Sequence, residues 1–422
     1  MSHTRCLLLI CLIAVAGCTR MPVQTILLTN PYDHSLQETC VVIERKAFRQ
    51  KDDSLHPVIY DREKARSLPV QVDDLDSDGS WDEASFLVSL KPGETFTGRL
   101  EWLPQEDVPV YPIRTNVYLG ISRKRNGYFK EVREEVFPSD YECRTPYQYQ
   151  FEGVGWENDV IAFRTYCDRR NGKDIFGKTT SKMILSDVGK IENYHELQSW
   201  GMDILKVGNS LGIGAVGAIK NGKIYRLGDT RYHDFQIIVE GPVRSVFKLG
   251  FDGWIVNGDT LSATETITIT AGRNGFSNRF EVTGDNVPDT LISGLSMIGI
   301  EGELVTFSNQ DWPGISLSGI NDLDGRFLGM AVFTKNPERF SAEITLKASE
   351  MYDVKSPEYQ AVKFHPYISD TYYLTTTGPV ADFYVFTLWE GRYPEIHTPE
   401  TFHKTVNQEL LSVIHAPEVV MR

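Results

Sequence analysis

Long apolar runs are almost missing from this chain of 422 residues. The exception is the start, where an apolar stretch from Cys6 to Val15 follows Arg5. That stretch is too short to span a membrane as a mature helix and is typical of a signal peptide. No second long apolar run follows, so we do not expect the rest of the chain to enter a membrane. A hydrophobic content of 41% is enough for one large core or two smaller ones.

The signal peptide is predicted to end at Ala16-Gly17-Cys18. Small residues before a cysteine resemble the lipobox of bacterial lipoproteins, in which cleavage precedes the cysteine and its thiol is acylated. We therefore expect an exported protein anchored to a lipid membrane through Cys18, on the periplasmic side of the bacterial cell envelope or at the cell surface. The alternative is an ordinary signal peptide with a coincidental cysteine.

Cysteine and positive charge are both scarce in the predicted mature chain. Cys40, Cys143 and Cys167 are an odd set without the pairwise spacing of a zinc site, which indicates small buried thiols with at most one disulfide. Lys and Arg number 43 against 57 Asp and Glu, which gives a formal net charge of -14. This excess of acid argues against nucleic acid as a partner, because phosphate binding requires a broad basic surface.

Helical periodicity is missing from nearly the whole chain, and strand patterns replace it. Residues 26–103 contain short segments rich in β-branched and aromatic residues, such as SFLVSL and FTGRLEWL, with Asn30-Pro31 and Lys91-Pro92-Gly93 as turn signals. Their number and size predict a small immunoglobulin-like β-sandwich. The residues before it are divided into a signal peptide (1–17) and a lipidated tether (18–25).

Residues 104–112, PQEDVPVYP, carry three prolines and predict a linker. Beyond it, residues 113–422 resume the strand pattern at a larger scale, in segments such as SVFKLGFDGWIV and FYVFTLWEG. Only residues 399–414 combine a proline start with helical spacing of apolar positions. We therefore predict a mainly β protein in which a large antiparallel β-supersandwich, closed by a short C-terminal helix, follows the small sandwich.

Two segments, one acidic and one rich in glycine, match the residue patterns of known motifs. In DDLDSDGSWDE, the carboxylates occupy calcium-loop positions one, three, five and nine, but Ser85 stands where the loop needs a bidentate glutamate. A structural calcium is one interpretation and a solvated acidic hairpin is the other. The candidate ligands are Asp74, Asp76, Asp78 and Asp82.

GIGAVG, residues 212–217, matches the nucleotide-binding pattern GxGxxG. However, Asn221-Gly222 follows and predicts a hairpin where a dinucleotide fold needs a helix. We therefore expect no nucleotide, and we expect the glycines to let the backbone pass close to another strand or a ligand.

Positive charge gathers in FRTYCDRRNGKDIFGK, residues 163–178, which has five basic and two acidic side chains. A solvated loop, a structural ion-pair network and a site for an anionic ligand are all possible interpretations. The period of two around Arg164 predicts one face in the core and one polar face that presents Arg164, Tyr166 and Asp168. Such side chains bind sugar hydroxyls and carboxylates.

Two later segments are also unusually polar and aromatic. YHELQSWGMDILKVG, residues 194–208, contains Tyr194, His195, Trp200, Asp203 and Lys206. RYHD adds His233 in a similar setting. A lone histidine is more often a structural group than a catalyst, but the company of these side chains favours a saccharide site.

Several long motifs resemble one family of bacterial lipoproteins, the domain of unknown function 4861. They are WENDVIAFRTYCDRRNGKDIFGK, YHELQSWGMDILKVGNSLGIG, GPVRSVFKLGF and QVDDLDSDGSWDEASF. The resemblance covers nearly all of the mature chain and implies a companion of polysaccharide-degrading enzymes, with a relative that dehydrates uronate-containing oligosaccharides. GPVRSVFKLGF with TETITITAGRNGFSNRFEVTG also resembles, more weakly, the supersandwich of galactose mutarotases and some polysaccharide lyases, which concerns the fold more than the activity.

These features suggest a carbon–oxygen lyase that eliminates water from a uronic acid without a cofactor. Arg164, helped by Asn158, would neutralise the substrate carboxylate, so that Arg164→Ala should abolish turnover and leave the fold intact. The base would be His195 or Tyr166, and the acid His233 or Tyr194. The remaining predicted substrate-binding residues are Asp168, Arg169, Lys178, Trp200, Asp203 and Lys206.

Two other functions stay open. A glycoside hydrolase needs a pair of carboxylates, for which Glu157, Asp168, Asp174, Glu196 and Asp203 are candidates. A lipoprotein that binds oligosaccharide without reaction would use aromatic platforms, for which Trp156, Trp200 and Tyr166 are candidates.

Overall fold

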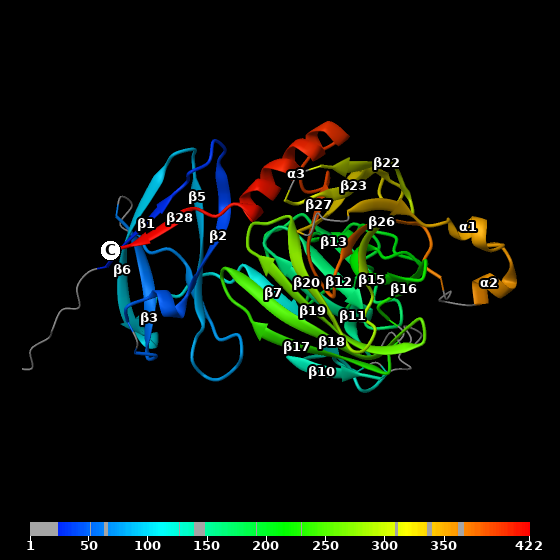
Figure 1. The fold of residues 1–422 in the computed structure, drawn as a ribbon, viewed down its shortest axis with the longest axis horizontal. Coiled ribbons are helices and arrows are strands. Elements are labelled where there is room, and N and C mark those ends of the chain that lie inside the picture. Colours follow the sequence, from blue (N-terminus) through cyan, green and yellow to red (C-terminus); the bar gives the residue numbers. More distant parts are fainter. Residues whose placement is uncertain are drawn as a thin grey trace, which may run out of the picture.

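The structure is a computed structural model of the chain. It describes residues 24–50, 52–62, 66–125, 127–138, 148–190, 192–228, 230–308, 311–335, 340–361 and 367–422. These residues form a small β unit and a large β unit, with one long helix lying between them (Figure 1). The predicted lipidation site Cys18 and the third predicted thiol, Cys143, lie outside the described residues.

The small unit is a sandwich of two antiparallel sheets. Its four-stranded sheet has the order β28 (Glu418–Met421), β1 (Gln24–Thr29), β6 (Thr95–Pro104) and β3 (Leu55–Asp61). Its three-stranded sheet has the order β2 (Leu36–Glu44), β5 (Glu83–Leu90) and β4 (Val70–Asp73). Burial alternates along β1, where Ile26 and Leu28 are fully buried and Leu27 between them is only partly buried. This period of two turns one side of each strand toward the core between the sheets.

The large unit is built from a nine-stranded antiparallel sheet and two five-stranded ones. The nine-stranded sheet has the order β10 (Glu134–Phe137), β17 (Tyr232–Val239), β18 (Arg244–Val256), β19 (Asp259–Thr270), β20 (Gly275–Thr283), β27 (Val380–Trp389), β24 (Phe327–Thr334), β23 (Gly314–Asn321) and β22 (Ile300–Phe307). One five-stranded sheet has the order β14 (Gly201–Asp203), β13 (Lys173–Lys178), β12 (Ala162–Tyr166), β11 (Gly153–Asn158) and β7 (Thr115–Tyr118). The other has the order β16 (Lys223–Arg226), β15 (Ile213–Lys220), β21 (Thr290–Ser296), β26 (Thr371–Thr377) and β25 (Ser341–Ile344).

The remaining elements are short, apart from one helix. They are the strand pair β8 (Gly120–Ile121) and β9 (Lys130–Glu131), the 3-10 turns η1 (Arg45–Ala47), η2 (Gln105–Asp107) and η3 (Gln150–Glu152), and the helices α1 (Ala348–Met351), α2 (Pro357–Ala361) and α3 (Pro399–Ile414). Within the described ranges, no helix combines the length and the apolarity needed to cross a bilayer.

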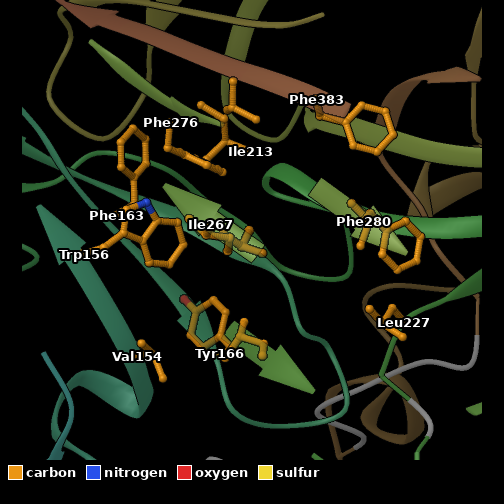
Figure 2. Packing of buried hydrophobic residues seen from close by; sticks show 14 of the residues in the cluster. Val154, Trp156, Phe163, Tyr166, Ile213, Leu227, Ile267, Phe276, Phe280 and Phe383 are labelled. Atoms are coloured by element: carbon orange, nitrogen blue, oxygen red, sulfur yellow. The ribbon is translucent and has the colours of Figure 1, made fainter. Parts of the chain in front are cut away.

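The core of the large unit lies between the nine-stranded sheet and the five-stranded sheets. Trp156 of β11 packs against Phe276 of β20 with ring centroids 5.1 Å apart, and Phe163 of β12 packs against the same ring at 4.8 Å (Figure 2). All three side chains are almost completely buried. The layers confirm the predicted fold class, a small N-terminal sandwich followed by a large antiparallel β-supersandwich with a C-terminal helix.

Helix α3 joins the two units. It begins where the Thr398 side chain accepts a hydrogen bond from the backbone of Thr401, and its buried face repeats at Phe402, Val406 and Leu410. Burying each of these side chains contributes roughly 1.5–3 kcal/mol. Near its end the Ser412 hydroxyl accepts a hydrogen bond from the backbone of β2 in the small unit. The predicted helix over residues 399–414 is confirmed.

The last strand differs from the predicted domain division. That division assigns residues 113–422 to the large unit, but β28 pairs with β1, with Leu28 opposite Val419, and so completes the small sandwich. Strand β28 carries Val-Val next to a charged residue and is too short for the sequence pattern to show which sheet it joins. Only the pairing partner decides it.

The segment with the GxGxxG letters forms strand β15 and a tight hairpin to β16. Asn221 and Gly222 at the turn have φ angles of 51° and 72°, as a type I′ turn requires, which confirms the predicted hairpin. Gly212 just before β15 has a φ of 65°, and a Cβ there would lie 1.8 Å from the carbonyl oxygen of Lys173. The predicted close passage of two backbones is therefore confirmed at this glycine.

Candidate functional site

Both faces of β12 are buried, which contradicts the predicted polar face. Phe163 points into the central core, whereas Ala162 and Arg164 point to the opposite side of the sheet. That side is covered by residues 179–200, here called the cap segment, of which residue 191 is not described. Apolar cap residues Ile184, Leu185 and Val188 pack there, with Tyr194 and Trp200 at the margin. The strand pattern alone gave no sign of this cover.

Glu157 holds the cap segment in place. Its carboxylate accepts hydrogen bonds from the backbone N–H groups of Ile184 and Leu185 at 2.8–2.9 Å, and it forms an ion pair with Lys178 at 2.7 Å. Both side chains of the pair are completely buried. A completely buried pair cannot contact a substrate. The predictions of Lys178 as a sugar ligand and of Glu157 as a hydrolytic carboxylate are therefore wrong.

Arg164 is the centre of a buried polar network. Its Nε and Nη2 donate to Oδ2 of Asp174 at 3.0 and 2.6 Å, and Nη2 also lies 3.1 Å from Oδ2 of Asp203. Nη1 donates to the carbonyl of Phe151 at 3.0 Å and to the hydroxyl of Tyr194 at 3.3 Å. The side chain is 2% exposed, so the guanidinium has no surface with which to bind a substrate carboxylate. Its predicted role as a carboxylate clamp is wrong because its bonding capacity is used within the protein.

Two carboxylates share this one guanidinium. Burial, followed by the negative charge of Asp203, raises the pKa of Asp174 to about 6, although Arg164 opposes the rise. Asp174 and Asp203 are 0% and 5% exposed, so neither can reach a glycosidic bond. The predicted hydrolytic pair is therefore not available at Asp174 and Asp203, and another candidate, Glu196, is exposed and bonded to Asn193 at 3.0 Å.

The network reaches the surface at His195. Nδ1 of the imidazole lies 3.3 Å from Oδ2 of Asp203, and the side chain is 61% exposed. The hydrogen bond to Asp203 raises the pKa of His195, with partial burial acting in the opposite direction. Because the carboxylate accepts at Nδ1, Nε2 is the ring nitrogen left for an external ligand. Asp203 thus orients an exposed base, which is the geometry of an acid–base group.

Tyr194 stands beside this imidazole. The two rings have centroids 4.4 Å apart, and the half-buried phenol accepts the hydrogen bond from Arg164 described above. Burial raises the pKa of Tyr194, and the positive charge of Arg164 opposes the rise. The structure therefore brings together four of the five predicted catalytic residues, Arg164, Tyr166, Tyr194 and His195, although Arg164 and Tyr166 are buried within the protein.

The backbone beneath the network is strained. Phe151 and Glu152 have φ angles of 40° and 65°, which non-glycine residues adopt at a cost of about 1–3 kcal/mol each. The Phe151 carbonyl accepts from Arg164, and the Glu152 carbonyl accepts from the backbone of Cys167 at 3.1 Å. No local sequence pattern marks Phe151 as part of this network.

Tyr166 and His233 cannot take the roles predicted for them. The Tyr166 hydroxyl donates to Asp174 at 2.9 Å inside the network, and burial raises its pKa well above the usual range. His233 stacks between Phe137 and Phe251, with centroids 4.6 and 5.7 Å apart, and burial lowers its pKa to about 4. An internal phenol and an imidazole enclosed by aromatic rings are structural groups.

Other predicted ligands are also structural. The Asn158 amide donates to the carbonyls of Thr270 and Arg273, each at 2.7 Å. Asp168 is buried and pairs with Arg170 at 2.9 Å. Trp156, a predicted platform, is fully buried in the core. All three predictions are wrong because these side chains bind the protein itself.

Three predicted substrate-binding residues remain at the surface. Arg169 is exposed, Trp200 is half-buried with its ring nearly perpendicular to that of Phe176, and Lys206 is 41% exposed and paired with Asp322 at 2.7 Å. Among the five basic residues of 163–178, four pair with buried carboxylates and Arg169 alone is exposed. Most of this run is therefore an ion-pair network.

The acidic hairpin gathers three of its four predicted ligands. Carboxylate oxygens of Asp74, Asp76 and Asp78 lie within 4.8 Å of one another. Oδ2 of Asp82 accepts from the backbone of Leu75 at 2.6 Å, so it stabilises the loop. Carboxylate oxygens are the donors that calcium prefers, so the donor set fits, and calcium stays a prediction. Among the described cysteines, Cys40 and Cys167 are both free thiols.

Comparison with known proteins identifies a family but no activity. The model of the domain of unknown function 4861 matches residues 28–419. An uncharacterized protein, P7, of Formosa agariphila is 30% identical over 177 residues, which are 37% of this chain and 43% of that protein. The chain thus spans less than half the length of this relative.

Solved structures with a related arrangement are more distant. An α-mannosidase from Enterococcus faecalis V583 has a TM-score of 0.45 and 8% identity, over 95% of this chain and 46% of that chain. A protein in the glycosyl hydrolase family 38 from Enterococcus faecalis has a TM-score of 0.44 and 8% identity, over 95% of this chain and 47% of that chain. A likeness at this level carries no conclusion about activity.

Proposed function

This chain belongs to the domain of unknown function 4861 family, and we propose that it eliminates water from uronate-bearing oligosaccharides by acid–base chemistry at His195. The observation that carries the proposal is the 3.3 Å contact between His195 and the buried carboxylate of Asp203, which occupies Nδ1 and leaves Nε2 of the 61% exposed side chain for a substrate. The choice of a uronate as the substrate rests on the family resemblance of the sequence and on the chemistry below.

A nitrogen base held in place can remove the proton from the carbon next to the carboxylate of a uronate. In this proposal Nε2 of His195 takes that proton, a carbon–carbon double bond forms, and the neighbouring hydroxyl leaves as water with the proton of the Tyr194 phenol. The imidazolium then returns a proton to the phenolate, which restores both groups. The ring centroids of the two residues are 4.4 Å apart, close enough for both to contact one sugar.

Arg164 is a positioning residue in this scheme. It fixes Asp203, which fixes the imidazole, and it lies 3.3 Å from the phenol oxygen, where its charge stabilises the phenolate. The cation that neutralises the substrate carboxylate must then be an exposed side chain. This replaces the role that the sequence suggested for Arg164.

One assay tests the proposal against hydrolysis and against binding alone. The mature chain is incubated with uronate oligosaccharides while mass and ultraviolet absorbance are followed. We expect loss of one water with a new conjugated chromophore, and we expect His195→Ala to abolish it. His397→Ala, in another exposed histidine, is the control. Gain of water on cleavage, or full activity of His195→Ala, would contradict the proposal.

Export and lipid anchoring at Cys18 are part of the proposal. The support is the sequence of the first eighteen residues, with an apolar segment that ends in Ala-Gly-Cys. In a bacterial host, the chain should enter the detergent phase on phase separation, and Cys18→Ala should move it to the aqueous phase. Equal partitioning of the two forms would remove this part of the proposal and leave the chemistry unaffected.

A further inference from the structure

A cavity of about 790 Å³ opens beside the loop that follows β12. Its volume falls within the usual range of small-molecule sites, roughly 300–1,000 Å³. The loop after β12, the hairpin of β15 and β16, and the segments near residues 345–351 and 367–368 surround it. We call it the basic pocket, because four cations line it and, among the residues that the structure describes, no Asp or Glu does. The four are Arg169, Arg170, Lys223 and Arg226.

The four cations differ in how far the protein neutralises them. Arg170 pairs with Asp168, whereas Arg226 directs its guanidinium at the backbone carbonyls of Arg170, Ser210 and Asn209 at 2.6–3.2 Å. Carbonyl oxygens satisfy hydrogen bonds but carry no full charge. Burial, followed by the charge of Arg170, lowers the pKa of Arg226 to about 10, which shows a cation beside a cation.

Arg169 and Lys223 face the solvent at this pocket. Both side chains are exposed, and neither forms an ion pair with any residue that the structure describes. A surplus of positive charge is thus concentrated in one concave site of a chain whose formal net charge is -14. Such a reversal of the local field attracts an anion to one site of a protein that is otherwise acidic.

The same pocket carries exposed apolar surface. Ile255, Leu346 and Tyr367 are 45%, 61% and 62% exposed, and all three line it. A phenol ring beside cations suits a ligand that has both an anionic group and a flat C–H face. A sugar ring with a carboxylate or a sulfate ester combines these two features.

The basic pocket is linked to the acid–base site through Tyr166. The guanidinium carbon of Arg170 lies 3.7 Å from the centroid of that ring, and the guanidinium carbon of Arg164 lies 4.5 Å from it. The buried network and the pocket are therefore neighbours that share one aromatic ring. A saccharide held in the pocket would lie beside the loop that follows β12, the strand that carries Arg164 and Tyr166.

We propose that the basic pocket binds the anionic group of an oligosaccharide, a carboxylate or a sulfate ester, through Arg169 and Lys223, with Tyr367 against the sugar ring. The proposal deepens the proposed function and rests on it only for the choice of a sugar as the ligand. It assigns to exposed cations the anion recognition that Arg164 cannot provide.

Calorimetric titration of the full mature chain tests the pocket. The probes are an unsulfated hexuronate tetrasaccharide, a sulfated galactan tetrasaccharide without uronate, and the neutral cellotetraose. All titrations use the His195→Ala background, so that no reaction disturbs them. We expect one or both anionic probes to bind, with an affinity that falls as salt is raised, and the neutral probe to bind at least about tenfold more weakly.

The variant Arg169→Gln/Lys223→Gln should weaken binding of the anionic probes by about tenfold or more. Lys248→Gln, at an exposed lysine on β18, is the matched control and should leave the affinity unchanged. The anionic probe that binds shows whether the pocket recognises a carboxylate or a sulfate ester. The proposal is overturned if no probe binds, if cellotetraose binds as tightly as the anionic probes, or if the double variant binds like the control.

The failure of this proposal is distinguishable from failure of the proposed function. If the pocket variant loses binding but the wild type does not dehydrate its substrate, the pocket is a binding site and the proposed chemistry is wrong. Dehydration that depends on His195 but is unaffected by Arg169→Gln/Lys223→Gln would leave the chemistry and remove the pocket.

Discussion

The carboxylate of Asp203 and the imidazole of His195 lie 3.3 Å apart, with the carboxylate 5% exposed and the imidazole 61% exposed. The hydrogen bond that the imidazole donates to this carboxylate raises the pKa of His195 above its ordinary value. A raised folded-state pKa stabilises the fold fully below the unfolded-state pKa, and this contribution is lost as the pH rises through the folded-state pKa. In a proton NMR titration, Asp203→Asn should move the His195 midpoint down toward the ordinary histidine value. An identical midpoint in both proteins would refute the role of Asp203.

Arg164→Met is expected to destabilise the fold. Removing the guanidinium leaves the buried carboxylates of Asp174 and Asp203 without their cation, which costs about 3–5 kcal/mol in comparable sites. The free energy of unfolding in urea measures this loss. Arg169→Met, at an exposed side chain of the same run, should change it by less than about 0.5 kcal/mol. Equal effects of the two changes would contradict the buried network, as would a native-like stability of Arg164→Met.

The pair formed by Lys173 and Glu265 should behave as one unit. The ammonium lies 2.6 Å from the carboxylate, and both side chains are completely buried. Lys173→Met leaves the buried carboxylate of Glu265 with only amide partners. It should therefore lower the free energy of unfolding by about 3–5 kcal/mol. The double change Lys173→Met/Glu265→Gln should cost less than the sum of the two single changes.

The matched control for this pair is Lys206→Met. Its pair with Asp322 is about half exposed on both sides, so its loss should cost no more than about 1 kcal/mol. Strict additivity of the Lys173 and Glu265 changes would show that the two groups do not interact.

His233→Phe should protect the fold from acid. Burial lowers the pKa of His233 to about 4, so protonation is easier in the unfolded chain than in the fold. Stability is therefore complete above the unfolded-state pKa of histidine and is lost as the pH falls toward 4. Phenylalanine fits between Phe137 and Phe251 without a titrating group. Near-ultraviolet circular dichroism during acid titration should show a lower midpoint for the variant, and an unchanged midpoint would count against the buried neutral imidazole.

The sequence predicted the layers of this protein because strand periodicity is local. Alternation along β1 and the Asn221-Gly222 turn are each visible within a few residues, and the structure has both. The position of β28 was not predictable, because its pairing with β1 joins residues almost 400 positions apart. Sheet membership of a short strand depends on such distant contacts.

The predicted grouping of Arg164, Tyr166, Tyr194 and His195 is present in the structure, but the predicted exposure of Arg164 and Tyr166 is wrong. The period of two grouped Arg164 and Tyr166 correctly, but no local pattern shows that the cap segment closes over them. One signal was available: in the hairpin of β12 and β13, Asp174 is the register partner of Arg164. An opposite charge directly across a strand pair indicates that the arginine has a protein partner.

The basic pocket was missed for a related reason. Lys223 and Arg226 are the first and last residues of strand β16, and they line the same pocket as Arg169 only in the folded chain. A count of charges along the sequence measures neighbours in the chain, whereas a ligand meets neighbours in space. The surplus of positive charge at the pocket is seen only when the cations that pair with carboxylates of the protein are left out of the count.

The pairing of β1 with β28 places the first and last described strands in one sheet. During synthesis the small sandwich therefore cannot gain its edge strand until residues 418–421 have been made, after the whole large unit. Early in its life the chain would carry an unpaired β1 edge, open to other strands. Shielding of that edge, by a chaperone or by speed of closure, would then govern the yield of correctly assembled protein.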